Sequence, residues 1–211
     1  NFYVVADNAD ADGNDATNDG RLFVYTKSGN NFTLRNTITT DIKLWGIIFI
    51  GNDLYAVADT TNELAVYSNF LNNTSTTTLA ASKQIAVEGI VRTHGLTYDS
   101  MTDTMVLTDI GDAGSGTDGG FHVIENFNSK FNGTANGATL AVGQQTRVAG
   151  SNTVLGNPVD VAYDGSTKTV YIAEAKNGKI LAFNNISTGG NVAPVYSTDL
   201  AAASAVYFHN E

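Results

Sequence analysis

The stretch Gly46–Tyr67, GIIFIGNDLYAVADTTNELAVY, contains the pattern that decides the fold. Gly46–Ile50 is almost wholly apolar, as expected of a strand that is buried on both faces. Gly51-Asn52-Asp53 has turn chemistry, because Gly and Asn accept a positive φ and Asp bonds to its own backbone. Leu54–Ala58 and Leu64–Tyr67 are rich in β-branched and aromatic residues, and the polar run between them reverses the chain. The stretch therefore predicts three consecutive strands joined by two tight turns.

The same unit recurs about every fifty residues along the chain. Phe2–Ala6 (FYVVA) repeats the pattern of Leu54–Ala58 (LYAVA). Each unit also has room for a fourth, outer strand, which in the second unit falls at either Thr76–Ala81 or Lys83–Val87. Four-stranded units at this period are typical of a β-propeller, whose sheets are arranged radially around an axis. The other copies of the unit lie at Leu22–Tyr25, Gly95–Asp109 and Val159–Phe183.

The two ends of the chain complement each other within this repeat. The first unit has no innermost strand before Phe2, and Ser204–Phe208 reads as an innermost strand with nothing after it. Joining the C-terminus to the N-terminus gives FHNENFY, which aligns without a gap on Phe49–Tyr55 (FIGNDLY). Pairing of these ends would remove open sheet edges, which otherwise template aggregation. We therefore expect an all-β propeller of about four four-stranded blades, closed by pairing of the C-terminal strand with the N-terminal blade. A segment of a longer array is the alternative. The expected blades of this single domain are 203–211 with 1–42, 43–90, 91–153 and 154–202.

The repeated unit resembles the NHL repeat and, more loosely, the NHL-like, YncE-like and SMP-30-like propellers. Gly46–Tyr67, Gly95–Asp109 and Val159–Phe183 carry the resemblance, which extends loosely to the first unit and so spans most of the chain. It implies a fold more than a function, because propellers serve as binding modules, scaffolds and hydrolases. The chain departs from these families in its blade count, since they usually have more than four.

Composition excludes several classes of function. A formal net charge of −10 with 11 Lys and Arg argues against nucleic acid, whose phosphates would be repelled. The sequence has no long apolar run that would span a membrane, and the lack of cysteine excludes disulfides and thiolate metal sites. The chain begins at Asn1, as expected of a processed product or an excised piece. Its bias toward Asn, Thr, Ser, Gly and Asp favours an exported, extracellular or cell-surface protein.

The loop Asp7–Gly20, DNADADGNDATNDG, has the spacing of a calcium-binding loop. Counted from Asn8, oxygen-bearing side chains occupy the first, third and fifth positions, a glycine occupies the sixth and a carboxylate the twelfth. Asn at the first position and a short Asp at the twelfth depart from the template, and a solvated acidic loop is the alternative. The predicted Ca²⁺ ligands are Asn8, Asp10, Asp12, Asn14 and Asp19.

A second long loop, Asp109–Gly120, occupies the equivalent position in the third unit, so both loops are expected to rise from one face. A strand follows it and GxxxxGK[ST] is absent, which excludes a phosphate loop. On that face Trp45, the only tryptophan, either stacks on a ligand such as a sugar or plugs the channel. His94 is either a hydrogen-bonded core residue or a base or metal ligand. The predicted binding face comprises Trp45, His94, Asp109, Asp112, Asp118 and Asp160.

Four acids occupy the same place in the four units, at the end of the second strand. They are interpreted either as a carboxylate ring that attracts a cation, or as acceptors for the backbone N–H groups of the turns they begin. The second interpretation is favoured, because a feature present in every blade is usually structural. These acids are Asp7, Asp59, Asp109 and Glu174.

Asn-x-Ser/Thr sequons fall in or near the expected outer strands, where a glycan is tolerated. Their number is what chance gives in a chain this rich in Asn, Ser and Thr. The glycosylation candidates are Asn31, Asn72, Asn73, Asn132 and Asn185.

Three functions are compatible with the pattern. The preferred one is a non-catalytic binding or structural module, calcium-stabilised, whose loop-bearing face meets a protein or carbohydrate partner. No nucleophile motif such as Gly-x-Ser-x-Gly occurs. The SMP-30 resemblance implies instead a metal-dependent hydrolase or lactonase, whose ion would be held by Asp109, Asp160, Glu174 and Asn157. The third function is a structural subunit of a homo-oligomer, filament or surface assembly, in which Ser204–Phe208 pairs with the next copy.

Overall fold

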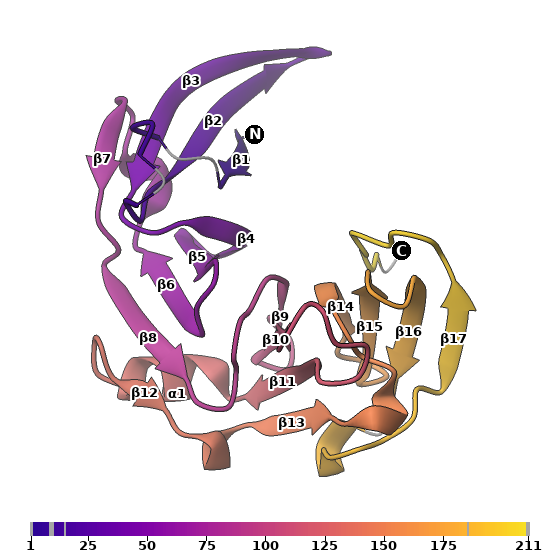
Figure 1. The fold of residues 1–211 in the computed structure, drawn as a ribbon. Coiled ribbons are helices and arrows are strands. Elements are labelled where there is room, and N and C mark those ends of the chain that lie inside the picture. Colours follow the sequence, from indigo (N-terminus) through magenta and orange to yellow (C-terminus); the bar gives the residue numbers. More distant parts are fainter. Residues whose placement is uncertain (1, 9–10, 15, 185, 210–211) are drawn as a thin grey trace.

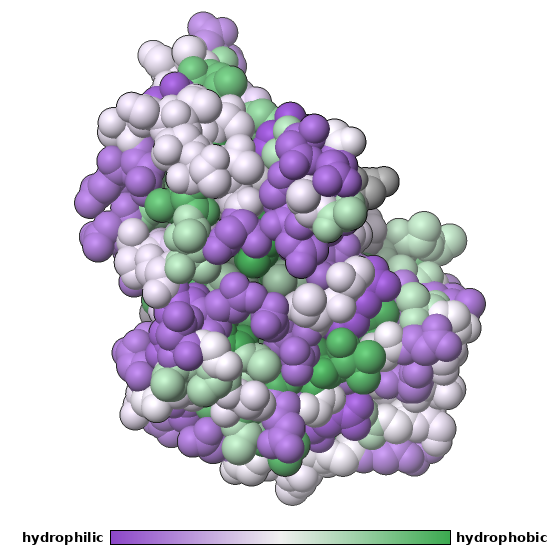
Figure 2. Space-filling model, turned by 60° about the vertical axis from the view of Figure 1, so that its left-hand side comes forward, coloured by the Kyte–Doolittle hydropathy of each residue, from purple (hydrophilic) through white to green (hydrophobic). Residues whose placement is uncertain are grey.

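The computed structural model describes residues 2–8, 11–14, 16–184 and 186–209. Most of this part of the chain is β-structure, organised as four mainly antiparallel sheets that follow one another in an arc (Figure 1). The expected all-β architecture of four blades is therefore confirmed. The outer surface is largely hydrophilic on the face shown in Figure 2, with apolar patches between the polar groups.

The strands of each sheet are given in chain order, from the inside of the arc outward. In the first sheet β1 corresponds to the second strand of the other units, so β2 corresponds to their third. The first contains β1 (Phe2–Asp7), β2 (Gly20–Ser28), β3 (Asn31–Thr40) and β7 (Thr77–Leu79). The second contains β4 (Leu44–Ile50), β5 (Asp53–Ala58), β6 (Glu63–Tyr67), β8 (Lys83–Val87) and β12 (Thr139–Leu140). The third contains β9 (Leu96–Asp99), β10 (Thr104–Asp109), β11 (Gly120–Glu125) and β13 (Thr146–Ala149). The fourth contains β14 (Pro158–Asp164), β15 (Thr169–Glu174), β16 (Lys179–Phe183) and β17 (Tyr196–Asp199). The helical segments are η1 (Phe70–Asn72), α1 (Phe127–Gly133), η2 (Val142–Gln144), η3 (Ser151–Thr153) and η4 (Ile186–Thr188).

The deciding stretch forms the three predicted strands β4, β5 and β6. Ile50 pairs with Asp53, so Gly51 and Asn52 make the two-residue turn, and Gly51 has the expected positive φ of 62°. The expectation that Gly46–Ile50 is buried on both faces is wrong, because these residues are only half-buried. An innermost strand has one edge turned toward the propeller axis, and this edge is not covered by another strand of its own sheet.

Neighbouring sheets are tied together by short parallel segments. β8 is the outer strand of the second sheet, whereas β7, the other candidate, pairs in parallel with β3 of the first sheet. β12 pairs in the same way with β8, and an isolated parallel bridge joins Val148 to Gly190. Each segment follows the helical turn that comes after the third strand of its unit, namely η1, α1 and η4. After its third strand, each of these units therefore first adds a short parallel segment to the outer edge of the preceding sheet. The chain then forms the outer strand of its own sheet.

The hydrophobic core lies between adjacent sheets. Between the second and third sheets, Phe127 and Phe131 of α1 are one helical turn apart and both buried against Tyr55. The ring centroids of Tyr55 and Phe131 are 5.2 Å apart at 66°, an edge-to-face contact. Separate clusters join the first sheet to the second, around Leu54, and the third to the fourth, around Phe121.

Glycines allow the innermost strands to converge. A Cβ added at Gly46 would meet the carbonyl oxygen of His94, and one added at Gly95 would lie 2.7 Å from the Cα of Asp160. Both neighbours are backbone atoms, which cannot rotate away. The Gly in the repeated Trp-Gly-Ile and His-Gly-Leu runs is therefore explained by the close approach of one innermost strand to the next.

Gly46→Ala is expected to destabilise the fold by about 1–3 kcal/mol, because the added methyl overpacks the backbone of His94. Urea unfolding followed by far-UV circular dichroism measures this loss. The control is Gly143→Ala, where an added Cβ has no neighbour within 4 Å and φ is not positive. Equal midpoints for the two variants would contradict the close-approach explanation.

The expected pairing of the C-terminal strand with the N-terminal blade is not observed among the described residues, so closure stays a prediction. In that part of the chain β1 pairs with β2 alone, and Ser204–Phe208 is not a strand. The N–H of Val206 instead donates to Oδ2 of Asp160 at 2.9 Å, and the Phe208 ring stacks on Tyr171 with centroids 5.8 Å apart. These contacts hold the segment on the fourth sheet, and Figure 1 shows its end across the opening of the arc from β1. Three residues of the predicted junction (1, 210 and 211) lie outside the described residues.

Candidate functional site

Trp45 and His94 form a stacked pair at the start of two innermost strands. Trp45 lies in β4 and His94 just before β9, and their ring centroids are 3.8 Å apart with an angle of 11° between the planes. Trp45 is 42% exposed, whereas His94 is 4% exposed. Because Gly46 has no side chain, the backbone of His94 can pass beside it and bring the two rings together. One face of the indole is therefore supported by a buried ring.

Asp59 organises the polar side of this pair. It lies in the turn after β5, and its Oδ1 is 3.0 Å from Nε2 of His94. The amide of Asn8 donates to Oδ2 at 2.9 Å, and the N–H of Thr60 donates to Oδ1 at 2.7 Å. Nη2 of Arg92 lies 3.4 Å from the same carboxylate. The imidazole is thus fixed by a carboxylate that is itself fixed by three other groups.

Asp59 and His94 do not form an ion pair at neutral pH. Burial lowers the pKa of His94 to about 4; Arg92 reinforces this shift, and Asp59 opposes it. Burial alone would raise the pKa of Asp59, but hydrogen bonds from Asn8 and His94 outweigh it and lower that pKa. At neutral pH the network therefore contains a neutral imidazole and an ionised carboxylate.

The other acids at the ends of the second strands act as backbone acceptors. Asp109 is fully buried, and its Oδ1 accepts N–H groups of Val91 at 2.9 Å and Gly111 at 3.2 Å. Glu174 is also fully buried and accepts four N–H groups. The donors to Glu174 are Gly156, Asn157, Lys176 and Asn177. These bonds support the structural interpretation of the repeated acids.

Three arginines that the sequence did not single out pair with three of these acids. The pairs are Arg21–Asp7 at 3.4 Å, Arg92–Asp59 at 3.4 Å and Arg147–Asp109 at 3.3 Å. The Nε atoms of all three arginines are buried without a hydrogen-bond partner in the described structure. The repeat of the sequence does not predict these arginines, because they lie at different places in their units. Arg21 lies in a third strand, Arg92 before an innermost strand and Arg147 in an outer strand.

In the loop predicted to bind calcium, carboxylate oxygens of Asp12 and Asp19 accept N–H groups of the loop itself. The amide of Asn8 is turned to Asp59, and Oδ1 of Asp12 accepts the N–H of Asn14 at 2.9 Å. Oδ1 of Asp19 accepts the N–H of Ala11 at 2.9 Å, and Asp10 lies outside the described residues. Within the described ranges, no group of three or more His, Asp or Glu side chains is arranged to hold a metal ion. Calcium binding stays a prediction.

The remaining predicted binding residues do not join the Trp45–His94 pair. Oδ2 of Asp118 accepts the N–H of Asp112 at 3.1 Å, so these two lie together within the Asp109–Gly120 loop. Asn177 donates to the carbonyl of Gly116 at 2.9 Å, which docks this loop on the fourth unit. Asp160 lies in β14, beside Gly95, where it accepts the N–H of Val206. The structure thus separates the predicted face into a stacked pair, an acidic loop and an inner-strand acid.

The sequons differ in their accessibility. Asn31, Asn72 and Asn132 are exposed, whereas the Asn73 amide donates to the carbonyl of Phe70 at 2.8 Å. Asn185 lies outside the described residues. Glycosylation at these positions stays a prediction.

Comparison of the sequence with protein-family models and with curated proteins found no match. Among solved structures, the fold is similar to a periplasmic gluconolactonase from Pseudomonas aeruginosa, with a TM-score of 0.61 and 12% identity. That match covers 96% of this chain and 55% of the lactonase chain. A chain in a nidogen/laminin complex is similar over 91% of this chain and 65% of its own length, with a TM-score of 0.52 and 12% identity. A putative 6-phosphogluconolactonase from Bacteroides uniformis is similar over 94% and 53%, with a TM-score of 0.55 and 14% identity.

These likenesses define the class of protein by its fold. The chain is a β-propeller, and it spans between about half and two-thirds of the length of the structures it matches. Among the described residues, no helix has the length and apolar character needed to cross a membrane.

Proposed function

We propose that the chain is a non-catalytic, exported propeller module that binds carbohydrate on its loop-bearing face. The observation that carries this proposal is the half-exposed Trp45 ring stacked on the buried His94. A flat, supported indole offers an apolar face to the C–H groups of a sugar ring, and its surroundings offer polar groups to the hydroxyls. No large ordering cost opposes binding, because the ring below already fixes the indole.

We call the stacked Trp45 and His94 rings the platform, and the polar groups of Asp59 and Arg92 beside them its rim. This rim fits the same ligand. The guanidinium of Arg92 is one-third exposed and carries more N–H donors than its contact with Asp59 uses. Sugar hydroxyls both donate and accept, so a rim with a carboxylate and a guanidinium matches them. An extended anionic ligand fits less well, because the chain has a net charge of −10.

The structural neighbours support export and a binding role only by analogy. One is described as periplasmic, and another was solved in a protein complex. Propellers host unrelated functions on one fold, so the argument for this chain rests on the site. The predicted calcium loop lies beside the platform through the Asn8–Asp59 contact, which would let a bound ion stiffen the rim.

Trp45→Ala is expected to weaken binding to any glycan that the wild-type protein selects from a glycan array by at least about tenfold. Trp45→Phe retains an aromatic face and should keep part of the affinity. The matched control is Tyr196→Ala, which removes an exposed aromatic ring from the outer strand β17. Affinities of the four proteins are measured by calorimetry with the selected glycan.

Two outcomes would contradict the proposal. One is an array on which the folded wild-type protein selects no glycan. The other is a selected glycan that binds Trp45→Ala as tightly as the wild type. Binding of a protein partner that is lost in Trp45→Ala, without glycan binding, would assign the same platform to a protein ligand.

A second candidate, a lactonase, is favoured by the descriptions of the neighbours, since two of the three solved structures named above carry a lactonase name. The acids assigned to its metal do not converge in the described structure. Asp109 and Glu174 accept backbone N–H groups of their own turns and of the loops beside them, and Asp160 lies on an innermost strand. Hydrolysis of gluconolactone above the spontaneous rate in the presence of Ca²⁺, lost in Asp109→Asn, would replace the binding proposal with this one.

A further inference from the structure

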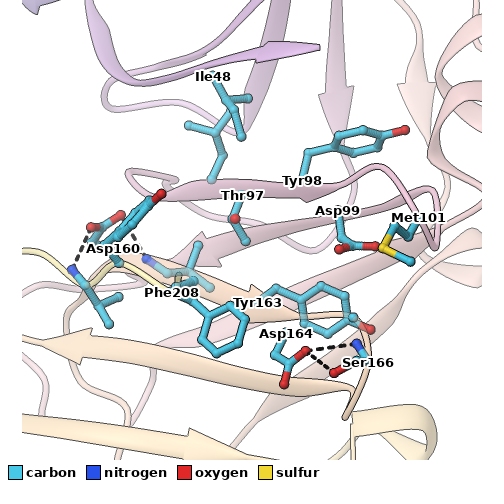
Figure 3. Close-up of a pocket in the computed structure, with 16 residues that line it drawn as sticks. Ile48, Thr97, Tyr98, Asp99, Met101, Asp160, Tyr163, Asp164, Ser166 and Phe208 are labelled. Carbon is cyan, nitrogen blue, oxygen red and sulfur yellow. Dashed lines mark hydrogen bonds between the residues drawn. The ribbon is translucent and has the colours of Figure 1, made fainter. Parts of the chain in front are cut away.

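A cavity of about 480 Å³ lies along the innermost strands β9 and β14. Ile48 of β4 and the C-terminal residues Val206, Tyr207 and Phe208 complete its wall. Figure 3 shows Thr97 and Asp99 on the side of β9 that faces Tyr163 and Phe208, whereas Tyr98 extends from the opposite side. This alternation is what a strand imposes on successive side chains.

The cavity is separate from the Trp45–His94 platform. One end of the cavity is formed by Asp99, the last residue of β9, and by Met101 and Ser166 in the turns between first and second strands. These turns precede β10 and β15, whereas Asp109 and Glu174 lie at the other ends of the same two strands. Asp160, nearer the platform, closes the other end through its bond with Val206. A ligand in this cavity would therefore lie beside the inner strands without touching the indole.

The wall combines aromatic rings with carboxylates and has no basic side chain. The aromatic rings on the cavity side are those of Tyr163, Tyr207 and Phe208, and the acids are Asp99, Asp160 and Asp164. The described structure shows none of the three acids in an ion pair with a lysine, arginine or histidine. Their partners are neutral: Thr102 for Asp99, the N–H groups of Val161 and Val206 for Asp160, and Ser166 and Thr167 for Asp164. The negative charge of the cavity is therefore uncompensated by the protein.

We propose that this cavity binds a small organic cation, a primary amine or diamine on an apolar stem. Aromatic faces attract cations through the ring quadrupole, and the attraction is larger where water is excluded. The apolar wall formed by Ile48, Val161 and Met101 matches the carbon stem. Anionic ligands are disfavoured by the three carboxylates, and neutral ones leave that charge unbalanced.

Asp160 is the acid on which binding depends most. It is the one acid of the three that lies between two innermost strands, because its Cα is 2.7 Å from the position of a Cβ on Gly95. Burial raises its pKa although the N–H groups of Val206 and Val161 oppose this shift, and no positive charge balances the ionised form when the cavity holds no cation. A bound ammonium group would supply that compensation, and binding should weaken as the pH falls and Asp160 takes up a proton.

The two methionines provide a sharp readout. Met101 lines the cavity and is 94% exposed, whereas Met105 is fully buried in the core between the second and third sheets. In protein labelled with [¹³C-methyl]methionine, the probe 1,4-diaminobutane should shift the Met101 signal saturably and leave Met105 unchanged. The isosteric diol 1,4-butanediol should produce no saturable shift.

Asp160→Asn is expected to weaken the diamine titration by about tenfold. Asp99→Asn, which keeps an oxygen acceptor for the Thr102 turn, should also weaken it, and this variant decides the matter if Asp160→Asn fails to fold. The matched control is Asp199→Asn, an exposed acid on the outer strand β17 that does not line the cavity, and it should leave the titration unchanged. No saturable shift of Met101, an equal response to the diol, or unchanged affinity in Asp99→Asn would overturn the proposal. These outcomes leave glycan binding at Trp45 untouched, so the two proposals fail separately.

Discussion

Replacing Asp109 by alanine is expected to destabilise the fold by about 2–5 kcal/mol, because at least two buried backbone N–H groups lose their acceptor, at about 1–3 kcal/mol each. Asp109 is fully buried, and its carboxylate accepts N–H groups of Val91 and Gly111 and pairs with Arg147 at 3.3 Å. The substitution leaves all of these donors without their acceptor. Because Val91 belongs to the connection between the second and third sheets, the loss should reach both. Urea unfolding at neutral pH measures the change in free energy.

The control for this prediction is an aspartate whose ion pair with a basic side chain is exposed. Lys179 and Asp199 lie 2.6 Å apart, but the Asp199 side chain is 87% exposed. Asp199→Ala is expected to change the free energy of unfolding by less than about 1 kcal/mol, because exposed pairs are screened by water. A loss for Asp109→Ala no larger than that for Asp199→Ala would contradict a structural role for the repeated acids.

Lowering the pH from 7 to 5 is expected to destabilise the fold by about 2 kcal/mol for each of two buried histidines. Burial lowers the pKa of His94 to about 4 and also lowers that of His122. The unfolded chain binds a proton at each ring near pH 6.5, whereas the folded chain does not bind one until the pH is much lower. Stability therefore falls as the pH drops below 6.5 and stops falling below the folded pKa values.

Other groups contribute little to this pH window or contribute with the opposite sign. The lowered pKa values of Asp59 and Asp164 stabilise the fold above pH 3.8, and that stabilisation is lost only at lower pH. The raised pKa of Asp160 makes the fold gain stability as the pH falls toward its unfolded value, which offsets part of the histidine effect. Urea midpoints at pH 7 and pH 5 should therefore differ strongly in the wild type and less in His94→Gln. A double variant, His94→Gln with His122→Gln, whose pH dependence equals that of the wild type would contradict the assignment.

The fold was predictable because the same local pattern of apolar strands and polar turns is repeated along the sequence. The Gly51–Asn52 turn and the strands on either side of it follow from residue chemistry alone, and the same pattern recurs in every unit. The connections between sheets were not predictable: Thr76–Ala81 indicates a strand at β7 but not which sheet this strand joins, and β12 has only two residues. Closure stays a prediction, because the match across the termini gives no information on the contacts that Val206 and Phe208 make with the fourth sheet in the described structure.

The candidate site was predictable in part. Trp45 and His94 stand at equivalent positions of two units, and this equivalence placed both on one face. Their stacking depends on Gly46, whose close contact with the neighbouring strand appears only in three dimensions. Asp59 was recognised as a repeated acid but not as the partner of His94. The arginines and His122 come from different strands of their units, so no sequence period relates them to the acids they contact.

The central claim is that the Trp45 platform binds a sugar. Since Trp45 is the only tryptophan, its fluorescence reports on this site alone. Titration with a glycan selected on the array is predicted to change the emission saturably, with a dissociation constant equal to that from calorimetry. Tight binding of the glycan with no change in Trp45 emission would contradict the claim.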